Sequence, residues 1–339
     1  MTAFVKHTRP SIGNVRRVLL PVEPDFALAR TVVGEHLSPT PLIASRLGDR
    51  EILLKLETFQ PTGSFKIRGA IAAAAALPSG SRIVTASAGN HALGIAWASA
   101  RLGVPATVVI AETASAAKRF ALEQLPVELI IHGRDYDAAE LHGLQLAADP
   151  GRRATYVSPY NDPNVIAGHA TMLDEILEQH PSGRPLVLVV PGGGGGLLAG
   201  IAIRAGVRSI KQRPISVYGV ESERSTGLSS SVRAGHWTEV EVGRTVADGL
   251  AGNLERGSIT VDLLQGRITG FVTVSEDQIA DAIRALARDH GLIAEGAGAA
   301  ALAAIRSGAI PEADGDLVAI VSGRNIALPT LAAILNAQP

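Results

Sequence analysis

The chain has 339 residues, of which 46% are hydrophobic and 19% charged, as in a folded protein with a sizeable core rather than a disordered one. Its formal net charge is −1 and acids alternate with bases, so a nucleic-acid-binding surface is not expected. The absence of cysteine excludes disulfides, zinc–thiolate sites, iron–sulfur clusters and cysteine nucleophiles.

No stretch has the pattern of a secretion signal or a membrane span. The longest apolar region, residues 186–203, is interrupted by Pro191 and five glycines. Near the N-terminus only the short run VLLPV follows four basic residues, which are Lys6, Arg9, Arg16 and Arg17. We therefore expect a cytoplasmic protein that acts on a small molecule and has no membrane or nucleic-acid partner.

Short runs rich in β-branched residues alternate with helical patterns along the chain. The pattern predicts helices within residues 91–103 and 114–125. Such alternation is typical of βαβ units and predicts an α/β fold with mostly parallel, buried strands. The predicted strands are residues 51–57, 82–86, 106–110, 127–131, 186–190, 215–220 and 317–322.

The segment after Ser275 reads SEDQIADAIRALARDHG and predicts a helix with marked ends. Ser275 and Gln278 form a capping box, and Gly291 is a suitable C-terminal cap. No internal repeat or long linker divides the chain. We expect residues 80–158, a run of short βα units, to form a small domain and residues 1–79 plus 159–339 to form a large one.

PGGGGGLLAG, from Pro191, follows a predicted strand and opens a helical pattern. Consecutive glycines let backbone N–H groups converge beside a positive helix end, which makes a phosphate-binding loop. A structural tight turn is the alternative use. A dinucleotide site is another, because Gly194, Gly196 and Ala199 fit G-x-G-x-x-A and Glu221 ends the next strand.

The stretch TASAGNHALG, residues 85–94, again leads from a strand into a helix. Its Ser87, Gly89 and Asn90, with the N–H groups of the helix start, suit a carboxylate, and the Asn90 amide can donate to a phenolate oxygen. An ordinary helix cap made by Ser87 or Asn90 is the alternative.

Two further motifs carry one residue of interest each. SGRN begins with Ser322, which ends the last predicted strand and so faces the ligand crevice of an open parallel sheet, unless it is a turn residue. TGSFKIRGA contains Lys66. A lysine can act as a nucleophile or base near neutral pH if its pKa is lowered, and otherwise Lys66 is a solvated lysine at a helix start.

Together the four motifs describe one cofactor, which has a phosphate, an aromatic ring and an aldehyde for the lysine. That cofactor is pyridoxal 5′-phosphate, and Lys66 would hold it as a Schiff base. In their order and spacing the motifs resemble the fold-type II pyridoxal-phosphate enzymes, specifically the serine/threonine dehydratase and serine racemase group. The resemblance runs from about Leu37 to Ala333.

The resemblance implies the fold of the tryptophan synthase β group, with two open twisted sheets flanked by helices and the cofactor between domains. It implies a lyase that removes water and then ammonia from a small β-hydroxy amino acid such as L-threonine or L-serine, with Lys66 as the catalytic base. The implied cofactor-binding residues are Phe65, Lys66, Asn90, Gly193, Gly194, Gly195, Gly196, Leu197 and Ser322. The implied substrate-binding loop is Ser87, Ala88, Gly89, Asn90 and His91.

This chain departs from the family pattern at several positions. Arg324 replaces a glycine of the usual SGGN, and Ala88 stands where racemases carry a serine. Glu221 matches one acid of a metal site found in some members, but Gly227 stands at the second, so no metal is expected. No sequence follows Pro339, so the amino-acid-sensing domain of biosynthetic threonine dehydratases is not expected. We expect a homodimer or another homo-oligomer.

Two alternatives remain beside the dehydratase. The dinucleotide pattern would make the protein an NAD-linked oxidoreductase, but it leaves TGSFK and SAGNHA unexplained. A non-catalytic ligand-binding protein on the same fold would not need the intact Lys66. Within the dehydratase group, residues 245–260, TVADGLAGNLERGSIT, look most like the hydroxyectoine-utilisation dehydratases, which would act on a hydroxyectoine-derived amino acid.

Overall fold

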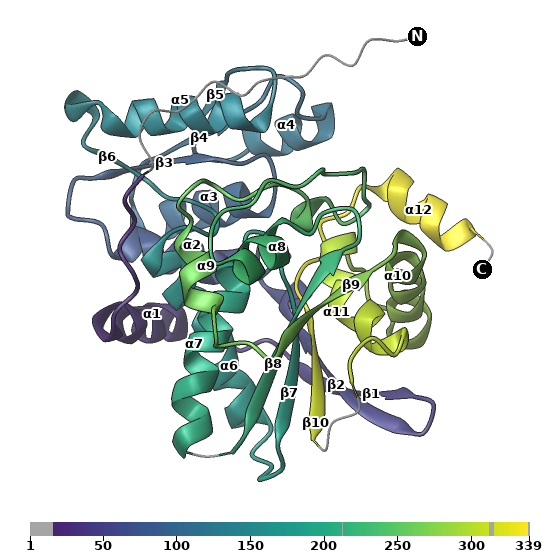
Figure 1. The fold of residues 1–339 in the computed structure, drawn as a ribbon. Coiled ribbons are helices and arrows are strands. Elements are labelled where there is room, and N and C mark those ends of the chain that lie inside the picture. Colours follow the sequence, from purple (N-terminus) through teal and green to yellow (C-terminus); the bar gives the residue numbers. More distant parts are fainter. Residues whose placement is uncertain (1–15, 212, 312–314, 338–339) are drawn as a thin grey trace.

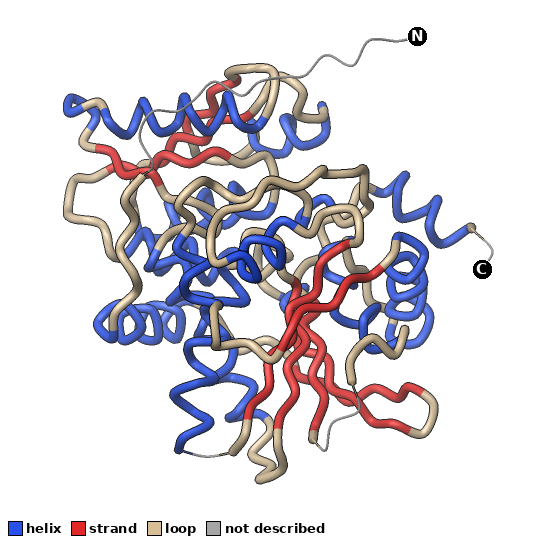
Figure 2. The backbone as a smooth tube through the Cα atoms, in the orientation of Figure 1, coloured by secondary structure: helices blue, strands red, loops and turns tan. Residues whose placement is uncertain are grey.

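The structure, a computed structural model, describes residues 16–211, 213–311 and 315–337 (Figure 1). Lys6 and Arg9, considered above for a secretion signal, lie outside these residues. Two β-sheets organise the described chain, one on each side of a layer of helices (Figure 2). In the part of the chain that is described, no helix is both long and apolar enough to cross a membrane.

The larger sheet has six strands in the order β1-β2-β10-β7-β8-β9, and the smaller has four in the order β5-β4-β3-β6. Every adjacent pair is parallel except β1 and β2, which form an antiparallel hairpin. The strands are β1 (Leu42–Leu47), β2 (Arg50–Leu56), β3 (Arg82–Ala86), β4 (Ala106–Ile110), β5 (Glu128–Ile131), β6 (Ala154–Tyr156), β7 (Leu186–Pro191), β8 (Ile215–Ser222), β9 (Gly270–Val274) and β10 (Asp316–Val321).

Helices connect the strands and cover both sheets (Figure 1). Three short 3₁₀ helices lie at Glu57–Phe59 (η1), Pro150–Arg152 (η2) and Asp248–Leu250 (η3). The α-helices are α1 (Glu23–His36), α2 (Lys66–Ala75), α3 (Asn90–Leu102), α4 (Ala116–Glu123), α5 (Tyr136–Ala148), α6 (Pro163–Gln179), α7 (Gly196–Lys211), α8 (Gly227–Ala234), α9 (Ile259–Leu264), α10 (Glu276–His290), α11 (Gly296–Arg306) and α12 (Leu328–Asn336).

The six-stranded sheet is buried on both faces because its central strands are apolar at nearly every position. Along β7, Val187 and Val189 pack with α10 and α11, whereas Leu186, Leu188 and Val190 pack with α6 and α7. Successive side chains of a strand point to opposite faces, so a continuous apolar run serves two cores at once. This explains why the run LVLVV was recognisable as a strand.

Helices α2 and α3 form the layer between the two sheets. Ile67 and Ile71 of α2 pack with Ile95 of α3 and Ile83 of β3 in one apolar cluster. On the other face of the four-stranded sheet, α5 packs against β3 and β6. The N-terminus of α2, where Lys66 lies, is therefore held between the two sheets.

All seven predicted strands and both predicted helices are present, with ends shifted by up to two residues. The capping box of Ser275 and Gln278 is formed, and Gly291 closes α10 with φ of 64°. Three strands were not predicted, β1, β6 and β9. They are strands of three to six residues with partly exposed positions, so their sequences lack the continuous apolar run that marks the buried strands.

Candidate active site

Lys66 is the first residue of α2, and the preceding loop sets its position. Gly63 has φ of +75°, and a Cβ there would come within 2.6 Å of the Asn325 side-chain oxygen. The loop then pairs with the chain after β10: Ser64 forms a bridge with Gly323, and the Phe65 N–H donates to the Ser322 carbonyl at 3.0 Å. The Thr-Gly-Ser approach is thus stitched to the end of a central strand.

The Lys66 amine lies in a site poor in water. Its Nζ donates to the Pro159 carbonyl at 2.8 Å and lies 5.2 Å from the centre of the Phe65 ring. Burial lowers the pKa of Lys66 to about 8, although the nearby Glu295 carboxylate acts in the opposite direction. A lysine with this pKa is partly neutral near physiological pH and can act as a nucleophile or base.

Phe65 also contacts a buried histidine. The ring of His169, on α6, meets the Phe65 ring edge-on at a centroid distance of 4.7 Å. Burial, with further contributions from Lys66 and His91, holds the pKa of His169 well below its ordinary value. A neutral imidazole therefore supports the Phe65 ring from the side of α6.

The loop before α3 lies directly beside Lys66. A Cβ on Gly94 would come within 3.2 Å of the Lys66 carbonyl carbon, so α3 approaches the start of α2 closely. The helix cap is Gly89, and no side chain caps it, while the Ser87 hydroxyl accepts from the Gly89 N–H. The alternative in which Ser87 or Asn90 is an ordinary helix cap is therefore wrong.

Two members of this loop differ in where their side chains lie. The Ala88 side chain packs with the apolar residues below the loop. His91 is 2% exposed, and its Nε2 lies 3.3 Å from the Val157 carbonyl. Burial lowers the pKa of His91 to about 3, so this histidine is neutral across the physiological range. The His91 imidazole is buried below the loop, which leaves its backbone as the group nearest a bound carboxylate.

The Asn90 side chain belongs to a chain of hydrogen bonds that the sequence did not reveal. Its Nδ2 donates to Glu295 Oε1 at 2.7 Å, and its Oδ1 accepts from Asn325 Nδ2 at 2.6 Å. Burial raises the pKa of Glu295 to about 7, and the negative charge of Asp248 adds to this. Glu295 stands alone in the segment IAEGAGAA. An isolated acid in such an apolar stretch was the signal that could have found it.

The glycine loop joins β7 to α7 and is packed from both sides. Cβ atoms on Gly194 and Gly196 would come within 2.3 Å and 2.8 Å of Tyr160, the residue after the Lys66 acceptor Pro159. Gly195 has φ of +85°, which favours glycine. The Gly194 carbonyl accepts from the Thr260 hydroxyl at 3.0 Å. The loop, including the backbone up to Leu197, therefore requires glycine for close packing and lies next to Lys66.

Residues 245–260, singled out above for their subfamily resemblance, surround the glycine loop. A Cβ on Gly193 would meet the Gly249 carbonyl at 2.9 Å, and the Glu255 N–H donates to the Tyr160 hydroxyl at 2.6 Å. The Glu255 carboxylate is held by Arg16, whose Nε lies 2.8 Å from Oε1. Tyr160 is thus fixed against the glycine loop by a segment nearly a hundred residues away.

Ser322 directly follows β10, as predicted, and is 2% exposed. Its hydroxyl donates to the Ala297 carbonyl over a long 3.4 Å. Because the Phe65 N–H binds the Ser322 carbonyl, the serine lies beside the start of α2. The structure therefore brings together the four motifs found in the sequence: the lysine loop, the asparagine loop, the glycine loop and the serine after the last strand.

Glu221 does not fit the dinucleotide alternative. It is 1% exposed, and its two carboxylate oxygens accept from the Leu228 and Ser229 N–H groups at the start of α8. Burial raises its pKa to about 7. Since both oxygens already bind the helix start, Glu221 is committed to capping α8 and does not face the glycine loop as a ribose-binding acid would.

Arg324 and the metal expectation complete the comparison with the sequence. Arg324 is exposed, and its Nη1 donates to the Thr58 carbonyl. Asp316, the acid considered as its partner, instead lies 2.8 Å from His180 Nε2. Over the described ranges, no group of three or more histidine, aspartate or glutamate side chains is arranged to bind a metal.

Comparisons with solved structures agree with this geometry. A maize serine racemase superposes with a TM-score of 0.83 at 27% identity, covering 93% of this chain and 97% of the racemase. A bacterial threonine deaminase, from the organism abbreviated T.th., superposes with a TM-score of 0.79 at 35% identity, covering 91% and 99%. These two proteins share the fold and much of the sequence.

Curated sequences point the same way. An L-threonine ammonia-lyase from Thermotoga maritima is 39% identical over 87% of this chain and 72% of its own length. A catabolic L-threonine dehydratase from Staphylococcus aureus is 36% identical over 92% of this chain and 91% of its own length. Residues 33–323 match the family described as pyridoxal-phosphate dependent enzymes. The chain therefore belongs to the pyridoxal-phosphate-dependent enzymes.

Proposed function

We propose that this enzyme converts L-threonine or L-serine into the corresponding 2-oxo acid and ammonia. The observation that carries the proposal is the position of Lys66, an amine with a pKa lowered to about 8, between the glycine loop and the asparagine loop. Relatives named as threonine ammonia-lyase and threonine dehydratase support the substrate class. We further propose that it works in the cytoplasm as a homodimer or another homo-oligomer.

The residues present fit pyridoxal phosphate. We propose that the N–H groups of Gly193–Leu197 hold the phosphate, because the first amides of a helix lack partners within it and Cβ atoms on Gly194 or Gly196 would collide with Tyr160. Asn90 uses one Nδ2 hydrogen for Glu295 and keeps the other for the phenolic oxygen of the ring.

Three further residues complete the cofactor site that we propose. Lys66 would carry the aldehyde carbon, Phe65 would lie against the ring, and the Ser322 hydroxyl would meet the ring nitrogen. A neutral hydroxyl does not favour a protonated ring nitrogen as a carboxylate does. This choice favours prompt loss of a β-substituent over amino-group transfer.

When bound, the cofactor withdraws electrons from the substrate Cα and so makes its proton acidic. We propose that Lys66 removes this proton, since its lowered pKa leaves a useful fraction of the amine neutral. The N–H groups of the Ser87–His91 loop, at the positive start of α3, would hold the substrate carboxylate. Loss of the β-hydroxyl follows, and the released enamine hydrolyses in water to the 2-oxo acid and ammonia.

The variant Lys66→Ala tests the assignment. We expect it to fold, to lose the visible absorbance of the bound cofactor and to release 2-oxo acid at least ~10³-fold more slowly, because both the covalent attachment and the base are removed. Substantial elimination by this variant without an added amine would contradict the role of Lys66.

A further inference from the structure

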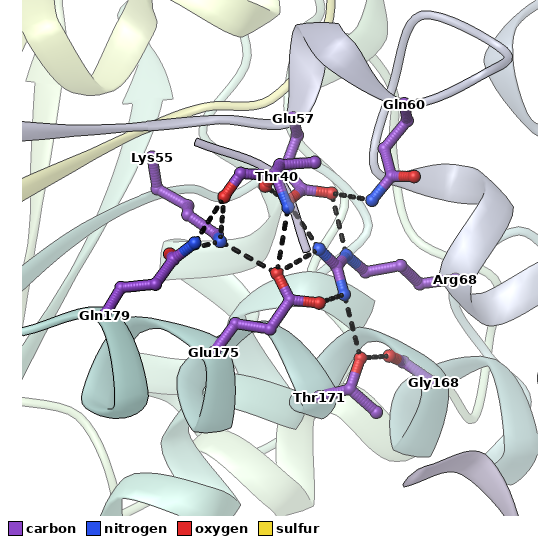
Figure 3. Close-up of polar contacts among 9 residues, drawn as sticks. All are labelled: Thr40, Lys55, Glu57, Gln60, Arg68, Gly168, Thr171, Glu175 and Gln179. Atoms are coloured by element: carbon purple, nitrogen blue, oxygen red, sulfur yellow. Dashed lines mark hydrogen bonds and ion pairs between the residues drawn. The ribbon is translucent and has the colours of Figure 1, made fainter. Parts of the chain in front are cut away.

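A group of four buried charges lies below the start of α2. It consists of Lys55 on β2, Glu57 in η1, Arg68 on α2 and Glu175 on α6, and we call it the ion cluster (Figure 3). The side chains of Lys55, Glu57 and Arg68 are 0% exposed and that of Glu175 is 12% exposed. Two positive and two negative charges make the cluster neutral.

Arg68 has a partner for every nitrogen of its guanidinium. Nε and Nη2 donate to the two oxygens of Glu57, both at 2.8 Å. Nη1 and Nη2 donate to the two oxygens of Glu175 at 2.5 Å and 2.8 Å. Nη1 also donates to the Thr171 hydroxyl at 3.2 Å. Two planar, bidentate ion pairs fix the guanidinium in one orientation.

Lys55 attaches the cluster to the six-stranded sheet. Its Nζ makes three hydrogen bonds, to the Thr40 carbonyl at 2.8 Å, to Glu175 at 2.8 Å and to Gln179 at 2.9 Å. The cluster therefore joins β2, the following 3₁₀ helix, α2 and α6, and the strand and both α-helices are themselves packed in apolar cores.

The position of Arg68 relative to Lys66 gives the cluster its consequence. The two residues are two apart on α2, which places them roughly 200° apart around the helix axis. Lys66 points to Pro159 in the active site, and Arg68 points away from it to Glu57 and Glu175. Fixing Arg68 thereby fixes the rotation of the first turn of α2, and with it the direction of Lys66.

The first turn of α2 also needs a nearby negative charge. It carries two cations, Lys66 and Arg68, and no acid. Cations at a helix N-terminus are unfavourable because the helix dipole is positive there. The carboxylates of Glu57 and Glu175 lie next to this turn and supply the charge that the turn itself lacks.

We propose that the ion cluster positions Lys66 for catalysis, with Glu175 and Arg68 as positioning residues. A buried ion pair is a poor means of stabilising a fold, because the cost of removing charges from water offsets much of their attraction. A network with strict geometry does specify an orientation, and the chemistry at Lys66 depends on orientation. This inference rests on the role of Lys66 proposed above.

The neighbouring residue on α6 provides a matched control. Asp174 has a side-chain exposure of 13%, close to the 12% of Glu175, and likewise pairs with two cations. Its partners, Arg204 at 2.9 Å and Arg208 at 2.6 Å, lie on α7 rather than on α2. Glu175→Gln and Asp174→Asn therefore remove one equivalent charge each, but only the first affects the attachment of α2.

The two holoenzymes are compared in kcat and KM for L-serine and in the pH midpoint at which their visible absorbance changes. For Glu175→Gln we expect kcat to fall about 10²-fold, as for a catalytic group displaced by about 1 Å, with KM nearly constant. The absorbance midpoint should also shift, because Lys66 carries the cofactor. Asp174→Asn should leave kcat, KM and the midpoint unchanged.

Equal losses of thermal stability in both variants, with kcat and the midpoint as in the parent enzyme, would overturn the proposal. Should Glu175→Gln not fold, Glu175→Asp keeps the charge and shortens its reach, and an unchanged kcat and midpoint there would overturn it equally. Failure of the proposed function looks different: Lys66→Ala would then retain activity, whatever the Glu175 variants do.

Discussion

At the scale of single residues, the chemistry depends on what stands opposite Lys66. Racemisation requires a proton donor on the face of the substrate away from Lys66, and Ala88 has no titratable group. We expect pyruvate to form from L-serine at least ~10²-fold faster than D-serine. Chiral analysis of the remaining serine beside the pyruvate yield measures this ratio. Comparable rates of D-serine and pyruvate formation would show that another group donates the proton.

Arg324 is the clearest departure from the family pattern, and the structure places its guanidinium on the Thr58 carbonyl. An inward arginine would have read a second acidic group of a long substrate. Because Arg324 is exposed, we expect Arg324→Gly to change kcat/KM by no more than about threefold, and equally for L-serine and for a longer β-hydroxy amino acid. A selective increase in KM for the longer substrate would assign Arg324 to substrate binding.

At the scale of elements, the glycine loop makes the sharpest steric prediction. A Cβ on Gly194 would lie 2.3 Å from the Tyr160 ring, whereas one on Gly206, in the helix that follows the loop, meets nothing within 4 Å. Overpacking typically costs about 1–3 kcal/mol, so Gly194→Ala should weaken cofactor binding roughly 5- to 150-fold.

Titration of the cofactor into the cofactor-free variants, followed by absorbance, measures this effect. Gly206→Ala serves as the control and should bind as the parent protein does. If Gly194→Ala also bound with unchanged affinity, the Tyr160 ring would not be fixed against the loop.

The sequence predicted the elements that carry a continuous apolar run or a marked cap. It also predicted the motifs, because glycine runs and a lysine after Thr-Gly-Ser are visible locally. Glu295 and Asn325 were missed since their importance comes from Asn90, which is distant in the chain. Tyr160 was missed for the same reason: only the folded chain places its ring on Gly194.

Some interpretations of the sequence stay predictions. The roles of Phe65 and Ser322 toward the cofactor depend on a ring whose contacts no observation described above tests. The hydroxyectoine-utilisation resemblance of residues 245–260 is in the same position. What the fold adds is that this segment surrounds the glycine loop, so differences in it can alter the site.

At the scale of the whole molecule, the two sheets support our proposal of a small domain of residues 80–158 against a large one of residues 1–79 plus 159–339. The four-stranded sheet uses strands from Arg82 to Tyr156 alone. An exposed ion pair, Lys118 with Asp248 at 2.9 Å, and the buried contact of Asn90 with Glu295 connect the two proposed domains. Contacts of this kind across the boundary let the asparagine loop approach a bound substrate.

Stability should depend on pH through buried carboxyls. Burial raises the pKa of Glu221 to about 7 from 4.5, so between these values the folded protein keeps a proton that the unfolded chain has lost. This contribution is present below pH 4.5 and is lost as pH rises through 7. Glu221→Gln does not titrate, so its stability relative to the parent should increase from about pH 5 to about pH 8 by as much as ~3 kcal/mol.

Urea unfolding of both proteins at the two pH values gives this difference directly. The other buried groups, including Glu140, Glu295 and His91, are the same in both proteins, so their contributions cancel in the comparison. A relative stability that is constant between the two pH values would show that Glu221 is already ionised in the folded state.

The central claim is that Lys66 carries pyridoxal phosphate in an enzyme that eliminates water and ammonia from β-hydroxy amino acids. The most direct measurement is reduction of the purified holoenzyme with borohydride, followed by mass spectrometry of its peptides and an assay of 2-oxo acid release from L-threonine. We predict that reduction abolishes release and leaves the cofactor attached to the peptide that contains Lys66. Attachment to another lysine, or full activity after reduction, would contradict the account.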